Sequence, residues 1–259
     1  MQEIIITTVV IGVIGLIIGI ALVAAGKKFY VAVDEKAIAV RECLPGNNCG
    51  ACGYAGCDAA IAAGDAPVNA CPVCSADAVA KIGGVMGVEA EAAQRKTAQV
   101  KCSGDCEHTS AKCNYVGIED CRAAALAGLN TGSCTFGCLG YGSCVKVCTY
   151  DAIHVVNGVA KVDTSKCVGC GMCAKACPKG LIEVLRADRT FVVQCSNKDR
   201  GPAVKKVCSA GCLGCGACVK QCEHDAIHVE GNLAYIDYDK CVGCGKCAEK
   251  CPAKNIVRQ

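Results

Sequence analysis

The stretch Cys241-Val-Gly-Cys244-Gly-Lys-Cys247-Ala-Glu-Lys-Cys251-Pro252 decides how this chain folds. Its spacing, C-x2-C-x2-C-x3-C-P, holds a four-iron cluster with the first three cysteines, while the fourth serves the other cluster of a pair. The run therefore predicts a partner run, and the chain has one upstream together with a further complete run. Their cysteines are Cys212, Cys215, Cys218 and Cys222, and Cys167, Cys170, Cys173 and Cys177. Zinc, the rival metal, binds to pairs of C-x2-C and has no use for a third closely spaced cysteine.

The composition favours a fold held by metal over one held by a large apolar core. The 259 residues include 28 cysteines, three Phe and no Trp. Units this poor in aromatic residues depend on disulfides or metal, and disulfides need an oxidising compartment. The regular cysteine triplets favour metal in a reducing cytosol. The net charge of +3 leaves no basic footprint for nucleic acid. No glycine-rich phosphate loop is present, so we expect one-electron transfer and no catalytic residue.

An uncharged segment opens the chain. Residues 4–25 form a run of 22 without a charge, and about 20 suffice to cross a bilayer. A cleaved secretory signal is the alternative, but no positive charge precedes the run, whereas Lys27 and Lys28 follow it. Because lysines stay in the cytoplasm, residues 1–26 are predicted to be a transmembrane anchor that keeps the cysteine-rich domains on the cytoplasmic side.

The remainder of the chain is expected to divide into five parts. These are a linker over 27–42, an amino-proximal 4Fe–4S domain over 43–95, a cysteine-rich connecting segment over 96–133, ferredoxin domain 1 over 134–190, and ferredoxin domain 2 over 191–259. The predicted fold class is α+β, with a transmembrane helix, a small iron–sulfur domain and two tandem two-cluster ferredoxin domains of the bacterial type.

The amino-proximal domain has its own cysteine spacing. Cys49, Cys52 and Cys57 lie on a glycine-rich loop as C-x2-C-x4-C, and glycine lets the backbone approach a cluster closely. The fourth ligand must come from the pair Cys71 and Cys74. Cys71 precedes a proline, as the closing cysteine of a ferredoxin run does, and Cys74 is the alternative.

The last part of the chain repeats itself. An offset of 74 residues carries Cys144 onto Cys218 and Cys134 onto Cys208. Each repeat separates its two cysteine groups by two short apolar runs, and Asn157-Gly158 predicts a β-hairpin over 155–162. One ligand position breaks the match, because Tyr141 stands where the second repeat has Cys215. We expect Cys134, four residues before Cys138, to replace the missing thiolate.

These matches predict five 4Fe–4S clusters. The expected ligand sets are Cys49, Cys52, Cys57 and Cys71; Cys134, Cys138, Cys144 and Cys177; Cys148, Cys167, Cys170 and Cys173; Cys212, Cys215, Cys218 and Cys251; and Cys222, Cys241, Cys244 and Cys247. Eight cysteines remain: Cys43, Cys74, Cys102, Cys106, Cys113, Cys121, Cys195 and Cys208. They are either buried free thiols or, in part, the ligands of a sixth cluster drawn from the 102–121 stretch with Cys195 or Cys208.

The order of these parts resembles the B subunits of Rnf-type electron-transport complexes. The resemblance rests on L-P-G-N-N-C-G-A-C-G-Y-A-G-C over 44–57 and on G-C-L-G-Y-G-S-C over 137–144, and it covers essentially the whole chain. The second repeat, from residue 191 on, is similar to the longer members of that family.

The resemblance implies a subunit of the bacterial inner membrane that accepts electrons from soluble ferredoxin. It would relay them to the other membrane and peripheral subunits of an ion-translocating ferredoxin:NAD oxidoreductase, without substrate chemistry of its own. Two alternatives are a reductase module that keeps a redox-sensing regulator reduced, and a membrane-tethered polyferredoxin that serves a hydrogenase or dehydrogenase.

Overall fold

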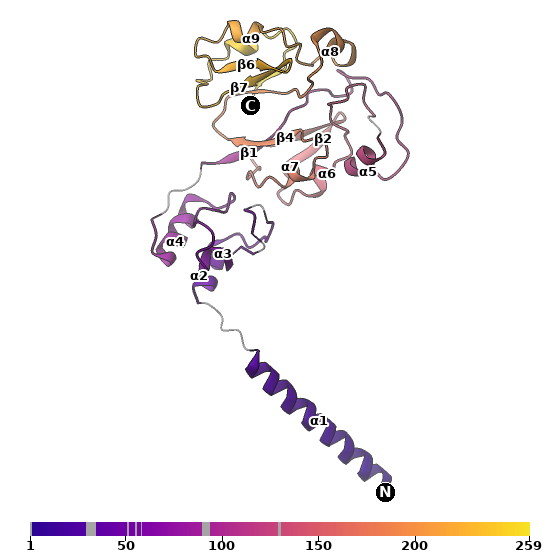
Figure 1. Cartoon of the computed structure of the whole chain (residues 1–259), viewed down its shortest axis with the longest axis vertical. Coiled ribbons are helices and arrows are strands. Elements are labelled where there is room, and N and C mark those ends of the chain that lie inside the picture. The colour runs from indigo at the N-terminus through magenta and orange to yellow at the C-terminus, as the bar shows by residue number, and fades with distance from the viewer. Residues whose placement is uncertain are drawn as a thin grey trace.

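The computed structural model describes residues 2–29, 35–50, 52–54, 56–57, 59–89, 94–128 and 131–259. Helix α1 (Gln2–Lys28) extends away from everything else in Figure 1. Among the described residues it is the single helix long and apolar enough to cross a membrane. Its most apolar 18 residues have a mean hydropathy of 2.9, and none of them is buried by the rest of the chain. Lys27 and Lys28 lie in its last turn. The predicted apolar helix is confirmed.

Three helices build the unit that follows: α2 (Glu35–Cys43), α3 (Ala59–Ala62) and α4 (Ala76–Met86). Val40, Ile61 and Ile82 meet in its small core. Because Val40 is fully buried there, α2 packs as part of this amino-proximal unit, although its residues 35–42 were expected to belong to a linker over 27–42. Residues 30–34 lie outside the described residues.

Two further units share one plan. Unit 1 contains β1 (Lys96–Val100), α5 (Cys121–Leu126), α6 (Ser143–Lys146), β2 (Ile153–Val156), β3 (Val159–Val162), α7 (Met172–Ala176) and β4 (Ile182–Arg186). Unit 2 contains β5 (Phe191–Val193), α8 (Gly201–Val207), α9 (Ala217–Lys220), β6 (Ile227–Glu230), β7 (Leu233–Ile236), α10 (Lys246–Glu249) and β8 (Ile256–Arg258). In each unit the first strand pairs with the last and the two middle strands form a hairpin, all antiparallel.

The hairpins confirm the repeat. Ile153 pairs with Val162 in unit 1, and their counterparts 74 residues later, Ile227 and Ile236, pair in unit 2. Asn157 and Gly158 have φ values of 51° and 80°, as a two-residue type I′ turn requires.

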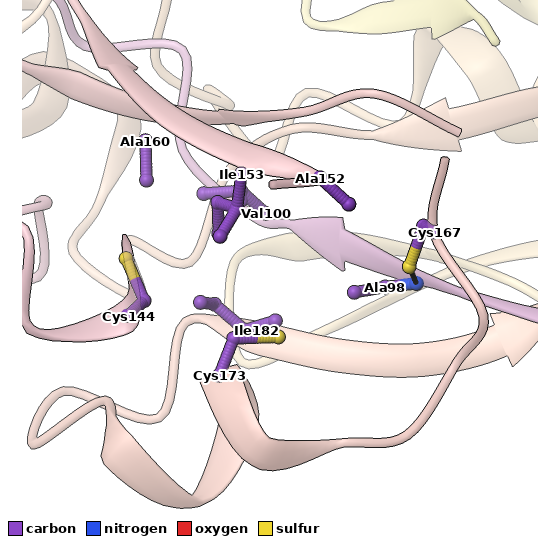
Figure 2. Packing of buried hydrophobic residues seen from close by; sticks show 9 residues of the cluster. All are labelled: Ala98, Val100, Cys144, Ala152, Ile153, Ala160, Cys167, Cys173 and Ile182. Atoms are coloured by element: carbon purple, nitrogen blue, oxygen red, sulfur yellow. Dashed lines mark hydrogen bonds between the residues drawn. The ribbon is translucent and has the colours of Figure 1, made fainter. Parts of the chain in front are cut away.

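Strand β1 corrects the expected start of unit 1. Residues 96–100, assigned to a connecting segment from the sequence, form five consecutive pairs with β4. Ala98 and Val100 are buried beside Ile153 and Ile182, as Figure 2 shows. The expected connecting segment over 96–133 is therefore part of unit 1. It begins with the first strand and continues to the first cysteine group. Thr97 and Gln99 are also buried, so the strand is buried on both faces although two of its inner residues are polar.

The same strand contacts the cysteine loop of unit 1. The backbone N–H of Ala98 donates to Sγ of Cys167 at 3.3 Å, the dashed line in Figure 2. The loop comes this near because residue 169 is a glycine with a φ of 69°, and a Cβ there would overlap the carbonyl oxygen of Lys96. An amide in the middle of β1 thus donates a hydrogen bond to a cysteine sulfur.

We predict that Ala98→Pro destabilises unit 1, because proline has no N–H for Cys167 and is poorly accepted inside a paired strand. Ala98→Gly is the matched control, since it keeps the N–H and costs only about 0.5–1 kcal/mol. The thermal midpoint of the proline variant, followed by circular dichroism without oxygen, should lie at least about 4 °C below that of the glycine variant. Equal midpoints would show that the contact contributes nothing.

Candidate metal centres

The first cysteine group surrounds a pocket in the amino-proximal unit. Its lining includes all four predicted ligands, which together form site I: Cys49, Cys52, Cys57 and Cys71. Asn48 fixes the loop, because its backbone N–H donates to Sγ of Cys57 at 3.2 Å and its side-chain oxygen accepts from the Cys57 N–H at 3.1 Å. Cys74 is not among the lining residues. Burial, and then the neighbouring Cys71, raise the pKa of Cys74 to about 12.

Site III consists of Cys148, Cys167, Cys170 and Cys173. Burial, followed by the nearby thiols of Cys167, Cys170 and Cys148, raises the pKa of Cys173 to about 11. The four predicted ligands are therefore neighbours. Cys170 also lies within electrostatic reach of Cys49, so site III is the neighbour of site I across the boundary between their units.

Two hydrogen bonds join these units beside the two sites. The Asn47 amide donates to the Tyr150 hydroxyl at 2.7 Å, and the Lys175 ammonium donates to the carbonyl of Gly50 at 3.3 Å. Tyr150 itself lines the pocket of site I. Side chains of unit 1 thus complete the surroundings of the amino-proximal cysteines.

The cysteines next to Tyr141 correct the sequence-based assignment. The pocket between α6 and β4 is lined by four cysteines, which we call site II: Cys121, Cys138, Cys144 and Cys177. Burial and then the thiols of Cys138, Cys121 and Cys177 raise the pKa of Cys144 to about 12. Cys134, expected here from its position four residues before Cys138, is not among the lining residues and lies in another pocket. Cys121 is the fourth cysteine that lines the pocket.

Local contacts explain how Cys121 reaches site II. Asp120 caps α5, and its carboxylate accepts a 2.7 Å hydrogen bond from the hydroxyl of Ser143. The same hydroxyl accepts from the Cys121 N–H at 2.7 Å. Ser143 precedes Cys144 on α6, so one side chain ties the two cysteines together. In unit 2 the equivalent residue is Ala217.

Tyr141 supports this arrangement instead of merely lacking a thiol. Its ring centroid lies 5.4 Å from that of Tyr115, with a tilt of 59°, a favourable geometry for aromatic pairs. Both rings pack against the small cluster of Cys121, Ala124 and Leu139. Tyr141 thus packs against the segment that brings Cys121 to the pocket. A sequence signal existed, because Tyr141 and Ser143 are both departures from the repeat.

Unit 2 holds the two remaining predicted groups. Site IV comprises Cys212, Cys215, Cys218 and Cys251; burial, and then Cys212, raise the pKa of Cys218 to about 11, with a smaller effect of Cys251. Site V comprises Cys222, Cys241, Cys244 and Cys247, and all four line one pocket. Cys215 and Cys244 are exposed.

Eight cysteines remained outside the predicted sets, and the structure separates them. Cys121 joins site II, while Cys102, Cys195 and Cys208 line one pocket together with Cys134. Cys43 and Cys74 are neighbours behind site I. Cys106 and Cys113 are exposed.

The cysteine groups suit iron–sulfur clusters. Among the residues that the structure describes, no three His, Cys, Asp or Glu side chains converge tightly enough for a single metal ion; the thiols stand around pockets instead. A cubane fits such a spacing, because each of its irons takes its own thiolate. Backbone amides also point at the sulfurs: Ala152 N–H donates to Cys148 Sγ at 3.4 Å and its counterpart Ala226 to Cys222 Sγ at 3.3 Å. Such contacts tune cluster potentials.

Comparison with family models supports this chemistry. Residues 44–73 match a putative Fe–S cluster domain, residues 160–183 a 4Fe–4S binding domain, and residues 211–255 a 4Fe–4S dicluster domain. The first match includes Cys71 and ends before Cys74. None of the three covers the region between 74 and 159.

Relatives match nearly the full chain. The B subunit of the Na⁺-translocating ferredoxin:NAD⁺ oxidoreductase complex of Acetobacterium woodii is 44% identical over 89% of this chain and 71% of its own length. The B subunit of the proton-translocating complex of Clostridium ljungdahlii is 40% identical, covering 92% and 85%. The B subunit of the ion-translocating oxidoreductase complex of Methanosarcina acetivorans is 38% identical, covering 94% of both chains. The chain therefore belongs to the family of B subunits of Rnf-type ion-translocating ferredoxin:NAD⁺ oxidoreductase complexes.

Proposed function

We propose that this chain is an electron relay that accepts electrons from soluble ferredoxin and passes them through 4Fe–4S clusters to the other subunits of its complex. The observation that carries the proposal is the series of neighbouring cysteine-lined pockets. The relatives' names supply the reaction class, and the absence of a phosphate-binding loop from the sequence favours NAD reduction on another subunit.

We assign five clusters to sites I to V, with the ligands named above. Units 1 and 2 are then two-cluster ferredoxin domains in tandem, since in each the last cysteine of one run serves the cluster of the other. At site I the pocket lining and the extent of the family match favour Cys71 over Cys74. At site II the pocket lining favours Cys121 over Cys134.

The neighbouring sites suggest the order of transfer. Site I lies next to site III through Cys49 and Cys170, and site III shares unit 1 with site II. Sites IV and V share unit 2, where exposed Cys215 and Cys244 bring the clusters nearest to solvent. Val242, between two ligands of site V, is 62% exposed. Soluble ferredoxin accordingly docks on unit 2, and electrons leave through site I on the side of α1.

The anchor sets the side of the membrane. The apolar helix and the family membership together indicate a membrane-associated protein. Lys27 and Lys28 at the end of α1 favour a cytoplasmic location for all the cluster-bearing units, because basic residues that flank a span remain inside. This location also gives access to soluble ferredoxin.

Iron analysis tests the relay most directly. Protein purified without oxygen should contain about 20 to 24 iron atoms per chain, from five or six clusters of four, with as much acid-labile sulfide. Reduced ferredoxin should then bleach its visible absorbance. About ten irons or fewer, or stoichiometric zinc, would refute the relay. Full iron content without bleaching would refute only the proposal that ferredoxin is the electron donor, and would leave the cluster assignment standing.

Ser143→Ala should loosen site II selectively. The substitution removes the acceptor for the Cys121 N–H, a bond worth about 1 kcal/mol, and releases Asp120. We expect a larger fraction of three-iron centres, seen by electron paramagnetic resonance after mild oxidation. Ala217→Ser, at the equivalent position of unit 2, is the control and should leave that fraction unchanged. If Ser143→Ala behaves like this control, Cys121 is held by other means or is not a ligand.

A reporter fused after Gln259 should be active only in the cytoplasm, because Lys27 and Lys28 oppose translocation. Replacing both lysines by glutamine should reduce this bias, and the unaltered chain provides the comparison. A periplasmic signal from the unaltered chain, or a mature N-terminus near Gly26, would contradict the assigned topology.

A further inference from the structure

Four cysteines outside sites I to V line a pocket where units 1 and 2 meet. They are Cys102, Cys134, Cys195 and Cys208, here called the seam site. The empty space of this pocket, including the part open to solvent, is ≈ 440 Å³, between the ≈ 510 Å³ at site I and the ≈ 380 Å³ at site V. Cys138 of site II also lines this pocket. The seam site therefore has four thiols of its own and a size similar to that of the pockets assigned to clusters.

The sulfurs of the seam site share neighbours. A Cβ on Gly104 would lie 3.4 Å from Sγ of Cys208 and 3.7 Å from Sγ of Cys102, so both sulfurs flank the same glycine. The thiol of Cys134 lies within electrostatic reach of those of Cys102, Cys195 and Cys208. The four cysteines thus form one group, with Cys134 near each of the others.

A buried amide also points at this group. Asn197 is 2% exposed, and its side-chain nitrogen donates to Sγ of Cys134 at 3.4 Å. Its backbone N–H donates to Sγ of Cys195 at 3.5 Å. Burying an amide is costly unless it is hydrogen-bonded. Asn197 donates to two sulfurs of this group, the type of contact that stabilises a thiolate bound to iron, while its side-chain oxygen accepts from the Asp199 N–H at 2.8 Å.

Hydrogen bonds hold the contributing segments together across the seam. Ser103 donates to the side chain of Gln194 at 2.7 Å, and Ser196 donates to the carbonyl of Lys101 at 2.9 Å. These contacts fix the segment that carries Cys102 against the one that carries Cys195. Cys102 and Cys195 are thus held at the same pocket, in position to bind one cluster.

The seam site is connected to the clusters on both sides. The backbone N–H of Cys138, a ligand of site II, hydrogen-bonds the thiol of Cys102. The backbone N–H of Cys212, a ligand of site IV, donates to Sγ of Cys195 at 3.2 Å. One peptide group therefore separates a seam sulfur from a ligand of each neighbouring cluster. The seam site therefore lies between site IV and site II in the proposed relay.

We propose that Cys102, Cys134, Cys195 and Cys208 bind a sixth 4Fe–4S cluster, which carries electrons between the two ferredoxin domains. The inference rests on the proposed relay and completes it. One electron leaves the reduced cluster of site IV and reduces the seam cluster, which then reduces the cluster of site II and returns to its oxidised state. No atom or proton changes place, and soluble ferredoxin is the reductant.

Four single variants of the full chain test the ligand set: Cys102→Ser, Cys134→Ser, Cys195→Ser and Cys208→Ser. Each variant should contain about four iron atoms fewer than the expected total of about 24, or should show a three-iron centre by electron paramagnetic resonance. The resonance position of that centre should be the same in all four variants. Cys113→Ser, at an exposed cysteine outside the pocket, is the matched control and should retain all the iron. In the assembled complex, Cys195→Ser should slow ferredoxin-dependent NAD reduction at least tenfold, whereas Cys113→Ser should not.

The unaltered protein supplies a measurement that does not depend on how the variants fold. After full reduction, its integrated spin count should be about six per chain, one for each reduced cluster. About five spins and about 20 irons would overturn the sixth cluster but leave the relay standing, and about ten irons or fewer would refute both. Loss of a cluster in Cys134→Ser with full retention in Cys195→Ser and Cys208→Ser would also overturn it, since Cys134 would then serve site II.

Discussion

Crowding of thiols in pockets of low polarity is the constraint on which the fold depends. Burial and neighbouring thiols raise the pKa values of Cys144, Cys173 and Cys218 to between about 11 and about 12. Without metal these thiols stay protonated and pack as weakly polar side chains. Iron binding would release their protons, and bonds to iron would offset the repulsion between the resulting thiolates. The apolar clusters are small, and cysteines belong to each one or pack against it. Folding and cluster binding are therefore one equilibrium in this chain.

The sequence predicted what local spacing determines. The runs at Cys167 and Cys241, the 74-residue repeat and the Asn157-Gly158 turn all act within a few residues, so their patterns are visible without a structure. The partners of β1 and of Cys121 were not predicted, because they lie far away in the sequence. Val100 pairs with Ile182, and Cys121 meets Cys177, and contacts between such distant residues leave no periodic trace.

Cys134 shows why a repeat can mislead. The offset matched Cys134 to Cys208 correctly, but the ligand missing at Tyr141 drew Cys134 into the nearest incomplete set. In the structure Cys134 and Cys208 line one pocket together, and Cys121 lines the pocket of Cys138, Cys144 and Cys177. Two nearby residues that both depart from a repeat, here Tyr141 and Ser143, suggest that another segment supplies the missing cysteine. That correlation is a better guide than proximity along the chain.

The two peptide groups that contact the seam sulfurs have a consequence for how the protein is made. The seam cysteines are spread from residue 102 to residue 208, so the ribosome releases the last of them long after unit 1 could collapse. A cluster held by these four cysteines would therefore be inserted last, after those of the two units. Without that cluster, the proposed relay would be a complete pair of domains with no electrical connection between them.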